Sequence, residues 1–501
     1  MSINLGNRTL FFGDNLYILK QHILSDSIDL IYLDPPFNSK ASYNVLFEEL
    51  TGDKSKAQIE AFDDTWHWTD ESEKAFQEIV DKAPPEVVDM ILAFRKFIKQ
   101  NDMMAYLTMM TIRLLELHRV LKPTGTIYLH CDPTASHYLK IVMDTVFGVK
   151  NFMNEIIWVR NSGSIGRTTF SKRHDVLLVY NKTENYFYDG KAVGDLREQN
   201  EGSFGGYFGT DENGRRYREV RKAGKVYKYY LDEPRNPNDV WIVPQIPERD
   251  KTERLGYNTQ KPRKLLERII KASAPKNGVV LDPFCGCGTT LSACEYLHQK
   301  EGYKLTWIGI DITHLAINLM KYRLKNEYGL EQRKDYDVIG EPKDLQGAIE
   351  LAQKQDRYDF QYWALSLINA KPYADKKKGA DTGIDGYIYF IDSDKPKEYQ
   401  KTIVQVKSGK VQARDIRELK AVVERERALL GIFLTLEEPT RQMVEEAVRA
   451  GFYKKDIPKI QILTIKDILE NVKRPLIPLQ LDYRKKADRV KINKDNLSLF
   501  D

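Results

Sequence analysis

Short apolar runs alternate with amphipathic stretches along the first part of the chain. Five runs rich in β-branched and aromatic residues end in polar, proline or glycine residues, which is typical of strands. They cover residues 8–12, 28–33, 126–130, 155–160 and 175–180. Apolar residues at helical spacing predict a helix over 103–120, with Lys122-Pro123-Thr124-Gly125 as its stop. The alternation of the two patterns indicates an α/β domain with a largely parallel sheet that is covered on both faces.

The same alternation returns later in the chain and then occurs again in a separate region. Helices are predicted over 264–272 and 289–298, and strands over 279–282 and 306–311. A polar, charged stretch over 325–354 indicates a linker or a connecting helix. Beyond it we expect a second, smaller α/β domain, with helices over 360–368, 415–427 and 440–450 and strands over 386–391, 402–406 and 431–434.

The segment 183–255 between these patterned blocks differs from both in composition. It is rich in Gly, Arg, Lys and Tyr, and basic residues alternate with tyrosines around Ala223-Gly224, which predicts a hairpin. Cations suit phosphates, and aromatic or Arg groups suit bases. The alternative is a solvated, charged hairpin. The basic residues are Arg215, Arg216, Arg218, Arg221, Lys222, Lys225 and Lys228, and the tyrosines are Tyr217, Tyr227, Tyr229 and Tyr230.

Composition limits the class of protein only coarsely. A length of 501 residues predicts more than one domain. No apolar run is long enough to span a bilayer and the first twenty residues lack a signal pattern, so a cytoplasmic protein without a membrane partner is expected. The net charge of +5 is too small to indicate nucleic acid by itself. One residue separates Cys285 from Cys287, which does not fit zinc spacing, so Cys131, Cys285, Cys287 and Cys294 are expected to be reduced thiols.

The tetrapeptide Asp34-Pro35-Pro36-Phe37 directly follows a predicted strand, where ligands bind in open α/β sheets. Two prolines fix φ and remove two N–H donors, so carbonyl groups in the turn can point into a pocket as acceptors. If Asp34 and the Pro35 carbonyl accept both hydrogens of an exocyclic amino group, its nitrogen can rehybridise and attack a methyl donor in line. Phe37 would stack on the ring. The alternative is a stiff surface turn.

A glycine-containing loop, 282–290, lies between a predicted strand and a predicted helix. Gly286 and Gly288 let the backbone turn tightly and approach a ligand. Asp311 ends a strand about twenty residues later and can accept hydrogen bonds from both ribose hydroxyls of a nucleoside. An ordinary tight turn and a dinucleotide site are the alternatives. Leu291 stands where the dinucleotide fingerprint wants a third glycine, so S-adenosylmethionine fits better than NAD.

Together these motifs resemble the amino-methyltransferases of DNA. The family's catalytic motif matches Asp34 to Phe37, its cofactor loop matches 282–290, its Gln-Lys-Pro motif matches 260–262, and its Gly-Asp motif matches Gly13-Asp14. The catalytic motif precedes the loop, as in the permuted β-type order. Phe37 replaces the commoner Tyr, and Asp311 the commoner Glu. The resemblance implies cofactor contacts from Asp14, Lys261, Asp282, Phe284, Gly286, Gly288, Thr289 and Asp311.

The resemblance also implies a division of the chain. Residues 1–182 would form the catalytic half of a Rossmann-like methyltransferase, 183–255 an inserted target-recognition segment, and 256–335 the cofactor-binding half. A linker over 336–355 would lead to a nuclease-like domain over 356–501. Methylation at C5 of cytosine is not expected, because that chemistry needs a cysteine after a proline in the catalytic loop, and Cys285 follows Phe284 in the cofactor turn.

The C-terminal block resembles the PD-(D/E)xK nuclease fold in its Mrr-type variant. The resemblance implies that Asp385 holds Mg²⁺, Gln405 replaces the usual acid, and Lys407 polarises the phosphate or the attacking water. Gln405 and Lys407 are two apart on a strand and so face one side. Gln361 stands where relatives carry a helix-borne acid, and Asp381 is a spare carboxylate nearby. The alternative is a domain that binds DNA without cutting it, in which case Mg²⁺ is not needed.

The leading hypothesis is site-specific N6-adenine methylation of double-stranded DNA by S-adenosylmethionine, in a fused restriction-modification protein. Asp at the first catalytic position favours adenine, since serine is commoner for cytosine. N4-cytosine methylation is the nearest rival. Methylation of RNA or of a protein glutamine, and a non-catalytic DNA clamp, are the more distant ones. A homodimer and a separate restriction subunit both stay open as partners.

Overall fold

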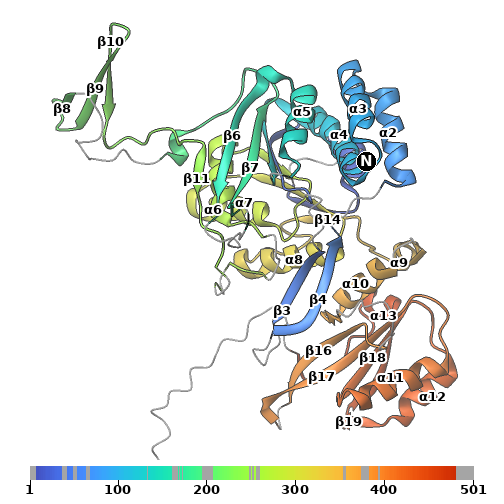
Figure 1. Cartoon of the computed structure of the whole chain (residues 1–501). Helices are drawn as coiled ribbons and strands as arrows, with labels where there is room; N and C mark the ends of the chain where they lie inside the picture. The colour runs from blue at the N-terminus through green and yellow to red at the C-terminus, as the bar shows by residue number, and fades with distance from the viewer. Residues whose placement is uncertain are drawn as a thin grey trace, which may run out of the picture. The chain divides into compact units, whose positions relative to one another are not determined.

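The computed structural model describes most of the chain (Figure 1). The described residues are 7–36, 42–48, 54–63, 68–132, 134–160, 168, 170–171, 173–194, 207–247, 250, 253–255, 260–353, 357–373, 383–392 and 395–480. Two compact units are present. The first contains residues 1–42, 63–255 and 259–340, and the second contains 43–62, 256–258 and 341–501. Phe37 and Asp381 lie outside the described residues.

A nine-stranded sheet forms the centre of the first unit. Strand β7 runs antiparallel to both of its neighbours, whereas the other pairings described for this sheet are parallel. This result confirms the predicted α/β class with a largely parallel sheet. In sheet order the strands are β11 (Val240–Ile242), β6 (Phe152–Val159), β7 (His174–Asn181), β5 (Leu121–Cys131), β2 (Ile28–Leu33), β12 (Val279–Asp282), β13 (Thr306–Asp311), β1 (Thr9–Phe12) and β14 (Asp337–Ile339).

Helices cover both faces of this sheet (Figure 1). One group packs together as α1 (Asn15–His22), α2 (Asp70–Lys82), α3 (Pro85–Ile98), α4 (Asp102–Val120) and α5 (Ser136–Phe147). The other group is α6 (Arg263–Ser273), α7 (Thr289–Glu301) and α8 (His314–Tyr328). Coverage on both sides explains why every residue of β2 is buried. None of the helices in the described part of the chain combines the length and apolar character needed to cross a membrane.

The predicted elements of this unit are confirmed, with two differences at their ends. Helix α4 ends at Val120, but β5 begins at Leu121, so Lys122-Pro123-Thr124-Gly125 lies within a strand rather than in a loop. The stretch over 325–354, expected as a linker or a connecting helix, contains the end of α8, the edge strand β14, which pairs with β1, and helix α9 (Leu345–Gln353). In β5 and β14, sheet pairing extends strands into polar residues that carry no apolar pattern of their own.

Two smaller sheets belong to the long insertions between these elements. Strands β8 (Tyr207–Thr210), β9 (Arg216–Lys222) and β10 (Lys225–Tyr230) form an antiparallel sheet, which confirms the hairpin predicted at Ala223-Gly224. Both turn residues have positive φ, at 50° and 76°, as a tight two-residue hairpin turn requires. Strands β3 (Ser42–Glu48) and β4 (Lys54–Asp63) form a separate two-stranded sheet. Short 3-10 turns lie at Val149–Asn151 and Lys191–Val193.

The second unit contains a mixed sheet with helices, as predicted. Strands β15 (Lys371–Pro372), β16 (Gly386–Asp392), β17 (Lys395–Lys407), β18 (Leu430–Thr435) and β21 (Ile460–Thr464) follow in this order, and β22 (Leu479–Gln480) pairs with β16. The β17–β18 and β18–β21 pairs are parallel. The other elements are α9 (Leu345–Gln353), α10 (Arg357–Leu367), α11 (Ala413–Arg425), α12 (Arg441–Arg449), α13 (Ile465–Leu469), β19 (Phe452–Lys454) and β20 (Ile457–Pro458).

Candidate active site

Four neighbouring parallel strands bring the predicted site residues to one edge of the large sheet. Strands β2, β12, β13 and β1 are adjacent in this order, so their carboxyl ends lie side by side. Asp34 follows β2, Asp282 ends β12, Asp311 ends β13, and Gly13 follows β1. The chain leaves β2 toward β5 on one side and leaves β12 toward β13 on the other. Such a reversal of strand order is where open α/β sheets bind ligands.

Asp34 and Lys261 form an ion pair at the catalytic corner. The Lys261 ammonium group donates to Oδ2 of Asp34 across 227 positions of sequence. Both side chains are largely buried, with 17% of Asp34 and 10% of Lys261 exposed. Lys261, which the motif placed next to the cofactor, therefore also contacts the predicted catalytic acid.

The glycine loop is fixed by backbone hydrogen bonds to the end of β13. The Cys285 amide donates to the Ile310 carbonyl oxygen at 3.1 Å, and the Gly286 amide donates to Oδ2 of Asp311 at 2.9 Å. Gly286 and Gly288 have φ of +48° and +73°, which favours glycine. A Cβ added at Gly288 would stand 2.6 Å from Cγ of Met320. Geometry and close packing thus both require glycine at position 288.

Two carboxyl groups of this edge have raised pKa values. The pKa of Asp282 is raised to about 7, chiefly by burial and also by the neighbouring carboxylates Asp34 and Asp311, against hydrogen bonds from Thr290 and the Phe284 amide. Burial raises the pKa of Asp311 to about 6, against hydrogen bonds from Thr313 and from backbone amides. Three carboxyl groups crowd this buried edge, which suits a cationic ligand, because a positive charge favours the ionised forms of Asp282 and Asp311. S-adenosylmethionine carries a sulfonium and an ammonium group, so the residues present fit it.

Two other residues predicted to contact the cofactor have structural partners. Asp14 caps α1 by accepting from the Tyr17 amide at 3.0 Å, and it also accepts from Arg113 at 2.6 Å. Thr289 begins α7 and is buried, with its hydroxyl oxygen 3.5 Å from Nη1 of Arg323. Asp14 follows Gly13, whose amide donates to the Asp311 carbonyl oxygen at 3.0 Å, and Thr289 directly follows Gly288 of the loop. Their roles toward a cofactor stay a prediction.

A buried polar chain that the sequence did not indicate lies beneath the catalytic corner. The Tyr32 hydroxyl is 2.9 Å from Nδ1 of His130, and Nε2 of His130 is 3.2 Å from Oδ2 of Asp175. Arg160 approaches the other oxygen of Asp175 at 3.3 Å. Burial lowers the pKa of His130, and the charge of Lys261 lowers it further. This series of polar contacts joins the adjacent strands β2, β5 and β7. In the sequence, polar residues within otherwise apolar strands are the one sign of these contacts.

A second contact missing from the sequence interpretation joins α1 to the glycine loop. The Asn15 amide donates to the Pro283 carbonyl oxygen at 2.8 Å, and its oxygen accepts from Nε of Arg113 at 2.6 Å. Burial lowers the pKa of Arg113, while Asp14 opposes that shift. Asn15 and Arg113 therefore brace the start of the loop from two different helices. No local pattern relates these positions, because 268 residues separate Asn15 from Pro283.

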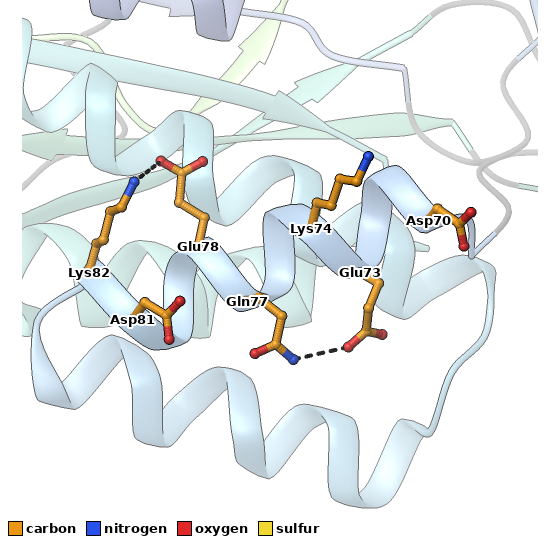
Figure 2. A pocket seen from close by; sticks show the side chains of 7 residues that line it. All are labelled: Asp70, Glu73, Lys74, Gln77, Glu78, Asp81 and Lys82. Carbon is orange, nitrogen blue, oxygen red and sulfur yellow. Dashed lines mark hydrogen bonds and ion pairs between the residues drawn. The ribbon is translucent and has the colours of Figure 1, made fainter.

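An open depression on the first unit lies away from these residues, along α2 (Figure 2). Two of its acids have cationic partners: Glu78 accepts from Lys20 at 2.7 Å, and Glu73 accepts from both terminal nitrogens of Arg95 at 3.0 and 3.1 Å. These partners lower the pKa of both glutamates. The surface is a solvated helix face with internal ion pairs, and none of the predicted site residues contributes to it. It is lined by Asp70, Glu73, Lys74, Gln77, Glu78, Asp81 and Lys82.

The basic residues of the hairpin differ in their surroundings. Arg215 is engaged with acids, since it donates to Asp232 at 2.8 and 2.9 Å and to Glu233 at 3.1 Å. Arg221 approaches Glu219 at 3.7 Å. The other predicted residues lie on strands β9 and β10 or flank their turn. They are Arg216, Arg218, Lys222, Lys225 and Lys228.

The second unit brings the three nuclease-like residues close together. Oδ2 of Asp385 accepts from the Val406 amide at 2.7 Å, next to Gln405 and Lys407 on β17. Gln405 is 4% exposed and donates through Nε2 to the Gly383 carbonyl oxygen at 2.5 Å. Its Oε1 has no hydrogen-bond partner among the residues that the structure describes. Within those same residues, no group of three or more His, Cys, Asp or Glu side chains could hold a metal ion.

Similarity to known proteins agrees with this arrangement. Residues 28–322 match the DNA methylase family model, and residues 352–470 match a restriction endonuclease family model. The chain is 30% identical over 236 residues to the type II methyltransferase M.HpaI of Haemophilus parainfluenzae, covering 47% of this chain and 64% of the relative. It is 26% identical over 372 residues to the Mod subunit of the type III restriction-modification enzyme StyLTI of Salmonella typhimurium, covering 61% and 52%.

A third relative and one solved structure are also similar to this chain. The DNA adenine methyltransferase YhdJ of Escherichia coli is 24% identical over 332 residues, with 65% of this chain and 86% of the relative covered. The solved PvuII DNA methyltransferase (cytosine-N4-specific) superposes with a TM-score of 0.39 at 13% identity, over 64% of this chain and 88% of that one. The chain thus spans between half and two thirds of the length of M.HpaI and the StyLTI Mod subunit. Because a DNA methylase model matches 28–322 and a restriction endonuclease model matches 352–470, the chain belongs to the DNA methylase family and carries a restriction endonuclease-like region behind the methylase.

Proposed function

We propose that the chain transfers a methyl group from S-adenosylmethionine to the N6 amino group of adenine in double-stranded DNA. The observation that carries the proposal is the shared edge, where Asp34-Pro35-Pro36 and the glycine loop follow adjacent parallel strands. An amino-group acceptor and a nucleoside-binding loop would thereby face the same space. S-adenosylmethionine supplies an electrophilic methyl group when it is bound.

The residues of the catalytic corner would orient the amino group of the base. Lys261 contacts Oδ2 of Asp34, so Oδ1 is the carboxylate oxygen suited to accept one amino hydrogen. The Pro35 carbonyl would accept the other, because two consecutive prolines leave this turn rich in acceptors and poor in donors. With both hydrogens held, the nitrogen lone pair points out of the ring plane toward the methyl donor. A base in duplex DNA must be extruded to reach this corner, which costs a few kcal/mol.

The cofactor-binding residues would act through the glycine loop and the three carboxylates. The positive φ of Gly286 and Gly288 gives the loop its tight turn, whose backbone would lie against the ligand, and Asp311 would accept from the ribose hydroxyls. Asp282 would organise the loop and add negative charge, since it accepts from the Phe284 amide at 3.1 Å. We also assign residues 183–255 to target recognition, between catalytic and cofactor-binding parts at 1–182 and 256–335.

One experiment separates this proposal from its rivals. Purified protein is incubated with S-adenosylmethionine that carries a labelled methyl group and with duplex DNA, and the nucleosides are identified by mass spectrometry. We expect labelled N6-methyladenine. Labelled N4-methylcytosine would instead select the cytosine alternative. A labelled RNA or protein acceptor, or binding of DNA without any transfer, would overturn the proposal.

A second candidate function concerns residues 356–501, which we propose act as a Mg²⁺-dependent DNA nuclease. The supporting observation is the buried Oε1 of Gln405, which has no partner within the described residues and lies next in sequence to the backbone amide that binds Asp385. An amide oxygen and a carboxylate are both ligands that Mg²⁺ accepts. We expect cutting of unmethylated plasmid that needs Mg²⁺ and is lost in Lys407→Ala. Intact plasmid with wild-type protein would leave a DNA-binding module instead.

The partners of the whole protein follow from these proposals. Duplex DNA is the expected substrate of both regions. Light scattering, with and without DNA, gives the mass of the protein in solution and so distinguishes a homodimer from a single chain that would need a separate restriction subunit. A single chain that methylates and cuts DNA by itself would contradict both expectations.

A further inference from the structure

The antiparallel sheet of β8, β9 and β10 has two chemically different faces. Side chains alternate along a strand, and residues directly opposite each other point to the same side. Arg221 lies opposite Val226, and Glu219 lies opposite Lys228. We call the side that carries these residues the paired face, made of Tyr217, Glu219, Arg221, Val226, Lys228 and Tyr230. The other side is the basic face, on which β9 and β10 place Arg216, Arg218, Val220, Lys222, Lys225, Tyr227 and Tyr229.

The cations of the paired face meet acids or rings of the same sheet. The Lys228 ammonium group lies 4.4 Å from the ring centroid of Tyr217, and Arg221 is 3.7 Å from Glu219. Tyr217 is only 9% exposed and packs against Tyr230, with ring centroids 5.9 Å apart. This face therefore packs within the small sheet, and it carries one acid, Glu219, beside its two cations.

The basic face has a different character. Its described strand positions on β8, β9 and β10 carry four Arg or Lys residues and no acidic residue. Tyr227 and Tyr229 stack with their planes 21° apart and are 42% and 40% exposed. Lys222 and Lys225 lie directly opposite each other beside the turn and are exposed. Cations around exposed aromatic rings suit a nucleic-acid surface.

We propose that the basic face binds duplex DNA and that the paired face does not. A two-stranded β-ribbon fits the major groove of B-DNA, and the tight turn at Ala223-Gly224 would let the end of this ribbon enter it. Cations along one face would then contact phosphates beside the groove. The inference rests on the proposed DNA methyltransferase function and deepens it by assigning the contact to one face of one sheet.

Two matched double variants of the full-length chain test the assignment. Arg216→Gln/Lys225→Gln removes an arginine from β9 and a lysine from β10 on the basic face. Arg221→Gln/Lys228→Gln removes the same two residue types from the same two strands on the paired face. Binding to a fluorescein-labelled duplex is followed by anisotropy across a salt series. Thermal melting checks folding, and S-adenosylmethionine affinity checks the cofactor site.

For the basic-face variant we expect at least about tenfold weaker DNA binding near 0.15 M salt, and a log–log salt slope shallower by about two. We expect the paired-face variant to keep the wild-type slope and affinity within about twofold, with both variants binding S-adenosylmethionine normally. Equal losses in both variants, or no loss in the basic-face variant, would overturn the assignment while wild-type methylation of DNA still stands. Wild-type protein that neither binds nor methylates DNA would instead overturn the proposed function.

Discussion

The two candidate sites differ in the number of their carboxylates and in the partners that these carboxylates bind. At the edge of the large sheet, Asp34, Asp282 and Asp311 gather with one close cation, Lys261, and burial keeps the pKa values of two of them high. In the second unit, Asp385 binds a backbone amide, and an amide side chain, Gln405, stands where a second acid is usual. The carboxylates of the first site suit a ligand that itself carries positive charge. The second has less charge with which to hold a metal ion.

The largest expected effect is the loss of methyl transfer in Asp34→Ala. Removing an acceptor that acts on the reacting nitrogen should lower kcat by about 1,000-fold. Because Asp34 is assigned to the base and is only one of the three carboxylates at this edge, affinity for S-adenosylmethionine should fall much less than kcat. Single-turnover methylation and calorimetric titration measure the two quantities. Near-normal transfer by this variant would contradict the assignment of Asp34.

The next effect is on cofactor affinity, in Gly288→Ala. A left-handed backbone costs a non-glycine residue about 1–2 kcal/mol, and the added Cβ would also stand 2.6 Å from Met320. Affinity for S-adenosylmethionine should fall by about tenfold or more. The matched control is Gly302→Ala at the other end of α7, which has φ of +70° and no atom within 4 Å of the added Cβ. Equal losses of affinity in the two variants would show that backbone strain alone, and not the loop, is responsible.

A comparable effect is expected from pH. A cationic ligand binds best when Asp282 and Asp311 are ionised, so affinity for S-adenosylmethionine should rise by about tenfold between pH 5.5 and 7.5 and then level off. Asp311→Asn should flatten the lower part of that curve. Without ligand, these two groups bind protons more tightly in the folded than in the unfolded state. Their contribution to stability is therefore present below about pH 4 and is lost as the pH rises to about 7. Affinity that falls with rising pH would refute the cationic-ligand explanation.

The smallest effect concerns the second unit, in Gln405→Glu. The substitution replaces the Nε2 donor to Gly383 with an oxygen, so the variant should melt lower than wild type without metal. Mg²⁺ should restore more stability to this variant than to wild type, by a few degrees, since a second carboxylate strengthens the site. Gln461→Glu is the control, because Gln461 is also a buried glutamine with hydrogen-bonded side-chain atoms. Its Nε2 donates to the Leu476 carbonyl oxygen and its Oε1 accepts from the Leu476 amide, both at 2.8 Å. An equal response of both variants to Mg²⁺ would argue against a metal site at Gln405.

Much of the fold and the edge of the site could be predicted from local pattern. Strands over 28–33, 279–282 and 306–311 end where expected because their apolar runs stop at polar motifs. The hairpin at Ala223-Gly224 could be predicted because its turn residues are adjacent in sequence. The short strands β8 and β14 were missed, since four and three residues carry too little pattern to distinguish from a loop.

The contacts that complete the site could not be predicted in this way. The Lys261–Asp34 pair, the Asn15–Pro283 hydrogen bond and the Tyr32–His130 contact join positions about 100 to 270 residues apart. They arise only when the sheet places β2, β5 and β12 side by side. Local pattern likewise could not distinguish Arg215 from the other basic residues of the hairpin. The acids that bind Arg215 follow β10, and nothing in the sequence indicates these ion pairs.

The central claim is that the catalytic corner and the glycine loop share one ligand site. A crystal structure of the protein with S-adenosylhomocysteine tests it most directly. The account predicts a ribose bound to the Asp311 carboxylate and a sulfur atom directed at the space beside Asp34. A cofactor bound elsewhere, or one whose sulfur faces away from Asp34, would contradict it.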